Sequence, residues 1–199
     1  MTLLVIAAVV LGVLVGRLGI FAEFFALADQ ASSWLLCALL LVVGIGLGQN
    51  KEVWQKLFHM GWRVAMIPLA VALGSLAGAA VSGLFLDMPV HEAMTVGAGF
   101  GWYSLSGLMI SQMGNVELGA VALLSNAFRE IIAMLIIPLV AAKVGKIAAI
   151  APGGATAMDT TMPLVSKACG HHVALLGFIS GAILTALVPV IVPIIYQLG

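Results

Sequence analysis

The chain has 199 residues, of which 63% are hydrophobic and only 8% are charged, and its mean hydropathy is +1.22. Soluble domains carry roughly 25% charged residues, so this composition excludes an ordinary soluble protein. The formal net charge is zero, and nothing in the charge pattern predicts a nucleic-acid partner. The composition therefore predicts an integral membrane protein whose surroundings are the lipid bilayer.

Five apolar runs are close to the roughly 20 residues that a membrane-spanning helix needs. In chain order they cover residues 3–20, 34–48, 64–86, 118–142 and 173–197. The first run lacks a basic segment before it and a small-residue cleavage pattern after it, so we interpret it as a helix and not as a signal peptide. The sequence thus predicts an all-α, polytopic membrane protein, with a single transport domain over residues 1–199 and about five transmembrane helices.

Two further stretches, 93–113 and 147–168, are apolar but irregular. The first contains GAGFGWYSLSG and the second contains APGGATAMDTTMPL, which combine glycines with hydroxyl side chains and, in the second, prolines. Such sequences make poor continuous helices, and irregular backbone is tolerated at membrane depth only where protein or water satisfies it. We therefore expect two broken segments in the interior of the protein.

The distribution of basic residues predicts the orientation in the membrane. Six of the eight Lys and Arg residues lie in three connections: Lys51, Lys56, Arg63, Lys143, Lys146 and Lys167. Loops on the cytoplasmic side carry the excess of basic residues, which places these connections inside the cell. The N-terminus is then cytoplasmic and the C-terminus external.

This orientation has a consequence for the irregular segments. An even number of crossings must separate residues 49–63 from residues 143–146, and the runs 64–86 and 118–142 already supply two. Segment 93–113 must then enter from outside and return, and segment 147–168 must do the same from the cytoplasm. Secondary transporters build their sites from such interrupted helices near the middle of the membrane. The alternative is that 93–113 is a full span, in which case Lys143 and Lys146 are external.

Three ionisable residues lie inside apolar sequence: Arg129, Glu130 and Asp159. A charged residue at the centre of a membrane helix costs about 2.5–3.5 kcal/mol, so each of them must face protein or water. Asn126 and Glu130 are four residues apart and share a helix face, whereas Arg129 points elsewhere and needs a partner on another element. We expect Arg129 to make a structural ion pair, for which Asp159 is a candidate partner.

The carboxylates of Glu130 and Asp159 are the candidates for binding an ammonium group or a coupling proton. Both have a structural alternative: Glu130 could tie helices together, and Asp159 could cap a broken helix. Aromatic faces attract cations, although an aromatic pair can also be an interfacial belt. Besides the two carboxylates, the predicted substrate-binding residues are Asn126, Trp102, Tyr103, Ser104, Ser106, Thr160 and Thr161. No cofactor and no metal site is predicted.

Three strings in the chain resemble the bacterial LysO-type lysine exporter family: GFGWYSLSG (99–107), NAFREIIAMLIIPL (126–139) and GGATAMDTTMPLV (153–165). LLLVVGIGLGQN (39–50) fits as well, and the likeness covers nearly the whole chain. The resemblance implies export of L-lysine and of its toxic analogue thialysine across the inner membrane. It also implies that an intramembrane acidic residue is essential, which by motif is Glu130.

The chain departs from this family in one respect. The typical member is longer and carries further helices before the matched region, one of which supplies an acidic site. We therefore expect a homo-oligomer, or a hetero-complex with a small membrane partner that supplies the missing N-terminal helices.

Two other classes of function are alternatives to an exporter. An intramembrane serine protease would need a general base beside Ser104 or Ser106, but all four histidines lie in connections or at segment ends. The sequence also lacks a GxGD motif, so we do not expect an enzyme. The remaining alternative is a passive channel or a non-transporting subunit of a membrane complex.

Overall fold

The computed structural model describes residues 62–199 continuously, together with a few single positions before them. Apart from those single positions, the predicted helices at 3–20 and 34–48 lie outside the described residues, as do Lys51 and Lys56. The chain divides into two compact units, Met1–Leu39 and Leu40–Gly199. Every element described below belongs to the second unit, and the single transport domain over 1–199 stays a prediction.

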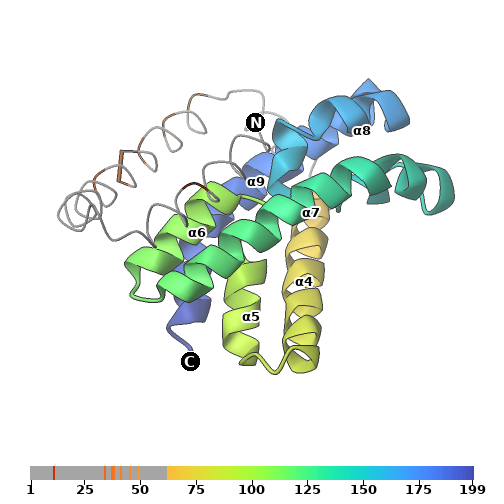
Figure 1. The fold of residues 1–199 in the computed structure, drawn as a ribbon. Coiled ribbons are helices and arrows are strands. Elements are labelled where there is room, and N and C mark those ends of the chain that lie inside the picture. The colour runs from red at the N-terminus through yellow and green to blue at the C-terminus, as the bar shows by residue number, and fades with distance from the viewer. Residues whose placement is uncertain are drawn as a thin grey trace. The chain divides into compact units, whose positions relative to one another are not determined.

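The described part of the chain is entirely helical, as predicted from the sequence (Figure 1). The three longest helices are α4 (Trp62–Phe85), α7 (Val116–Lys143) and α9 (His171–Tyr196). All three are long and apolar enough to cross a membrane. They confirm helices at three of the five apolar runs, whereas the total number of crossings stays a prediction.

Each irregular segment is broken into short helical pieces. Segment 93–113 contains the end of α5 (Val90–Gly97) and α6 (Tyr103–Gln112). Segment 147–168 contains two short 3₁₀ helices, η1 (Ala148–Ile150) and η2 (Gly154–Met158), and most of α8 (Met162–Cys169). Both segments are therefore discontinuous helices, in agreement with their glycine content.

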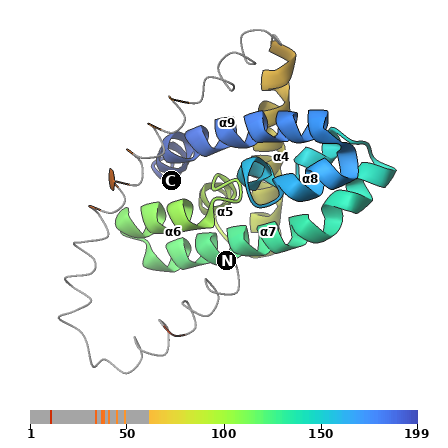
Figure 2. The same ribbon diagram turned by 90° about the horizontal axis from the view of Figure 1, so that it is seen from above.

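The broken segments lie between the long helices. Viewed from above, α7 and α9 run on opposite sides, with α5 and α8 between them (Figure 2). The short helices α5, α6 and α8 each contact both α7 and α9, while α4 packs mainly against α5 and α9. The two irregular segments thus form the interior of this unit, where the long helices shield their backbone.

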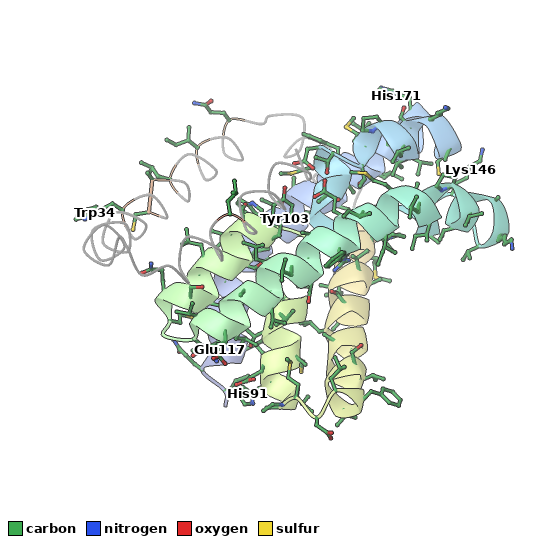
Figure 3. All side chains as sticks on the ribbon, viewed as in Figure 1. Trp34, His91, Tyr103, Glu117, Lys146 and His171 are labelled. Atoms are coloured by element: carbon green, nitrogen blue, oxygen red, sulfur yellow. The ribbon has the colours of Figure 1, made fainter. Side chains whose placement is uncertain are left out.

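The ends of the elements show that both broken segments turn back on themselves. His91 and Glu117 lie at one end of the unit, Lys146 and His171 lie at the other, and Tyr103 lies between the two ends (Figure 3). The Tyr196 hydroxyl donates a hydrogen bond to the Met113 carbonyl at 3.5 Å, which places the end of α9 beside the end of α6. Membrane insertion of the two segments, and which end faces the cytoplasm, remain predictions.

Small residues allow α9 to approach the second broken segment closely. A Cβ added to Gly181 would lie 2.6 Å from the Met158 nitrogen and 2.7 Å from the Ala155 carbonyl oxygen. Gly177, one helical turn earlier, also faces this segment, at Ala157. These glycines let η2 lie directly on α9, which positions the loop that contains Asp159.

Candidate functional site

The two broken segments meet at their tips. The Ala155 nitrogen, at the start of η2, donates a hydrogen bond to the Phe100 carbonyl in the α5–α6 break at 2.8 Å. Phe100 is fully buried and has a φ of 49°, in the left-handed region that bulky residues rarely occupy. Gly154 has a φ of 59°, and a Cβ on it would collide with the Phe100 carbonyl, so only glycine fits there.

Asn126 holds the α5–α6 break in place from the middle of α7. Its Oδ1 accepts a hydrogen bond from the Gly101 nitrogen at 2.8 Å, and its Nδ2 donates to the carbonyls of Val96 at 3.0 Å and Ala122 at 2.9 Å. The side chain is buried, and both of its polar atoms are bonded to backbone. The structure therefore gives Asn126 a positioning role, and its contact with substrate stays a prediction.

Arg129 holds the second break, one helical turn further along α7. Its Nε donates to the Pro152 carbonyl at 3.2 Å and its Nη2 to the Ala151 carbonyl at 3.3 Å. Its Nη1 donates to the Ser75 hydroxyl of α4 at 2.8 Å. The expected ion pair is thus corrected: the partners of Arg129 in the described structure are neutral oxygens and do not include Asp159. The guanidinium satisfies carbonyls that follow η1, which is favourable because the end of a helical segment carries a partial negative charge.

Glu130 lies on a different side of α7 from Arg129 and is only 3% exposed. Its Oε2 is buried and has no hydrogen-bond partner. Asp159 and the Thr160 side chain lie close to this carboxyl group, and Tyr103 is within electrostatic range of both carboxylates. A buried carboxyl oxygen without a partner is costly, so a proton or a cationic ligand would stabilise this arrangement.

Asp159 and Thr160 form the outer part of this site, and both are exposed. The Oδ1 of Asp159 accepts hydrogen bonds from the Thr160 nitrogen at 2.6 Å and from the Thr160 hydroxyl at 3.4 Å. These contacts join Asp159 to its neighbour Thr160, while α8 begins after Thr161 without a side-chain cap, so the predicted capping role has no support in these hydrogen bonds. The structure brings the two predicted carboxylates together, although they are 29 positions apart in the sequence.

The remaining predicted residues divide into two groups. Trp102 and Tyr103 are half-buried and Ser104 is exposed, so all three stay accessible at the start of α6. Ser106 and Thr161 are fully buried. The Ser106 hydroxyl donates to the Trp102 carbonyl at 2.8 Å, and the Thr161 hydroxyl lies 3.3 Å from that of Thr156. These two hydroxyls form hydrogen bonds within the breaks themselves, and their assignment to the binding site stays a prediction.

Sequence reasoning missed two contributors. Ser75 is a hydroxyl inside an apolar run, which is the sequence signal that another polar group lies nearby. Phe100 belongs to the GFGWYSLSG motif, but its backbone conformation and its carbonyl contact leave no trace in the sequence. Within the described residues, no three His, Cys, Asp or Glu side chains gather in a way that could hold a metal ion.

The fold of the described residues and the site together define a helical membrane protein in which two interrupted helices meet beside a buried carboxylate, Glu130. The model of the family described as "Lysine exporter LysO" matches residues 6–196. The chain therefore belongs to the lysine exporter LysO family, as its motifs predict.

Two relatives show how far this similarity extends. The chain is 32% identical over 184 residues to "Lysine exporter LysO" of Escherichia coli. The matched region covers 92% of this chain but only 60% of that protein. It is 29% identical over 186 residues to "Putative lysine exporter" of Haemophilus influenzae, covering 94% of this chain and 93% of that protein. No solved structure matches the chain.

Proposed function

We propose that this chain is a secondary transporter that exports L-lysine, and its analogue thialysine, across the bacterial inner membrane. The observation that carries the proposal is Glu130, a 3% exposed carboxylate with an unpartnered oxygen at the meeting point of two broken helices. Membership of the lysine exporter family and the names of the two relatives support lysine as the substrate.

The proposed mechanism uses Glu130 and Asp159 as alternating sites for the side-chain ammonium of lysine and for a proton. Asp159 is exposed and can receive a cation from solvent, whereas Glu130 lies deeper. A carboxylate in a desolvated site holds a cation or a proton strongly, because leaving it charged and alone is unfavourable. The faces of Tyr103 and Trp102, at the start of α6, add cation–π attraction for an ammonium group.

The test is lysine efflux from proteoliposomes that contain this chain alone, measured with and without a pH gradient. A coupled exporter moves lysine against its gradient when protons flow the other way, and an uncoupler abolishes that uphill flux. Lysine movement that only follows its gradient supports the passive channel. No lysine movement, from vesicles in which the protein is shown to be inserted, supports a non-transporting subunit.

The oligomeric state stays a prediction. A homo-oligomer, or a complex with a small membrane partner, is expected on the family resemblance alone. Light scattering of the purified chain in detergent gives the mass of the protein component. A monomer that transports lysine in the proteoliposome assay would contradict the expected assembly.

A further inference from the structure

A cavity of about 270 Å³ lies between α4, α5 and α7. Leu86 and Met88, in the connection between α4 and α5, line one part of it. Ser75, Asn126 and Arg129 line another part, next to the crossing of the broken segments. Ser75 and Ser82 both line the wall formed by α4, and seven residues of helix correspond to roughly 10 Å. The cavity therefore extends from the end of the unit that contains His91 to its interior.

Arg129 contributes a positive charge to the wall of this cavity. Three of the five N–H groups of a guanidinium are used by the oxygens of Ser75, Ala151 and Pro152. Two N–H groups remain, and none of the described carboxylates forms an ion pair with Arg129. A largely buried cation that faces only neutral oxygens is incompletely compensated, so an anion entering the cavity would be stabilised.

The chemistry of the wall indicates which kind of anion fits. A guanidinium presents its donors in a planar fork that matches the two oxygens of a carboxylate. Ser125 adds a hydroxyl group to a lining that is otherwise mostly apolar, whereas the Ser82 hydroxyl already donates to the Gly78 carbonyl at 2.8 Å. Glu130 is not part of this lining, but it follows Arg129 directly in α7, so the cavity lies next to the carboxylate site.

We propose that this cavity binds the α-carboxylate of the exported amino acid, with Arg129 as the binding residue. The inference rests on the proposed function, since it concerns the other end of the same substrate. Arg129 attracts an amino acid through its carboxylate and repels a diamine that has none. The arginine would thus select lysine against cadaverine, which is lysine without its carboxylate.

The obvious variant, Arg129→Gln, would also remove the contacts that hold Ala151 and Pro152. A better variant acts through Ser125, which lies four residues before Arg129 and therefore on the same face of α7. Ser125→Asp places a carboxylate beside the guanidinium, where it competes with the substrate carboxylate while Arg129 keeps its three present contacts. Ser125→Asn has the same shape without the charge and is the matched reference.

The experiment measures binding of lysine, lysinamide and cadaverine to the purified full chain by calorimetry, and lysine transport in proteoliposomes. Charge-assisted hydrogen bonds are worth enough that losing them weakens binding by about 10- to 100-fold. We expect Ser125→Asp to raise the Kd and KM for lysine by that factor over Ser125→Asn. For cadaverine and lysinamide, the same substitution should leave the Kd unchanged or lower it.

The outcomes separate this inference from the proposed function. If the unsubstituted chain transports lysine but Ser125→Asp and Ser125→Asn have equal KM values, the inference is overturned and the function stands. It is also overturned if lysine and lysinamide bind equally well. A third contrary result is that replacing chloride by gluconate abolishes lysine transport by the unsubstituted chain but not by the two Ser125 variants, because the cavity then holds an inorganic anion. If the unsubstituted chain neither binds nor transports lysine, both proposals fail.

Discussion

Asn126 is the residue whose structural role can be tested most directly. Asn126→Ala removes a side chain that accepts one hydrogen bond from the Gly101 nitrogen and donates two to backbone carbonyls. The perturbation leaves α7 intact, because alanine is the best helix former. Its effect should therefore be confined to the α5–α6 break.

The size of the loss in stability depends on which hydrogen bonds the three backbone groups keep after the substitution. The Gly101 nitrogen loses the partner that the structure gives it, and an orphaned buried donor costs about 1–3 kcal/mol. The Val96 carbonyl keeps the Gly99 nitrogen at 3.2 Å, and the Ala122 carbonyl keeps its place in the helix, so each of these bonds is worth about 0.5–1.5 kcal/mol. Asn126→Ala should lower the free energy of unfolding by roughly 2–6 kcal/mol.

The assay is denaturant-induced unfolding in detergent micelles, accompanied by hydrogen exchange at the amide of Gly101. Ser125→Ala is the control, since Ser125 is an exposed neighbour on the same helix and should change stability by less than about 0.5 kcal/mol. Asn126→Ala should also speed exchange at Gly101. If its stability equals that of Ser125→Ala while its KM for lysine rises, Asn126 contacts the substrate and the positioning role is refuted.

Three further predictions concern the site and the topology. Glu130→Gln keeps the shape of the side chain but not its charge, so this variant should insert normally and fail to export lysine. Glu130→Asp should retain part of the activity. If lysine efflux from proteoliposomes is normal in Glu130→Gln, the residue is structural. Gly154→Ala should lower stability by more than about 1 kcal/mol in unfolding experiments, because alanine is strained at its positive φ and its Cβ meets the Phe100 carbonyl. Gly78→Ala lies in open space within α4, where alanine is the better helix former, so it should not lower stability; an equal loss in both variants would contradict the argument. Cysteines introduced at Glu92 and Glu117 should react with a membrane-impermeant thiol reagent from the same, external side; labelling from opposite sides would mean that 93–113 is a full span.

The positions of the helices and of the breaks could be predicted because both depend on local composition. Long apolar runs must bury their backbone groups in helices, and glycine-rich stretches such as 97–107 cannot continue one. Glu130 and Asp159 could be singled out for a similar reason, since a charge in apolar sequence always needs an explanation. These inferences use only neighbours in the sequence.

The amino-acid sequence by itself determined that this is a helical membrane protein of the lysine exporter family, with two interrupted helices and two candidate carboxylates. Only the tertiary structure decided which polar groups form hydrogen bonds with one another. Arg129 donates to the carbonyls of Ala151 and Pro152 and not to Asp159, because the crossing brings those carbonyls to it. The polar atoms of Asn126 are bonded to the backbone of the other break. Such pairings depend on segments that are more than 20 residues apart and meet only after folding, so no local pattern records them.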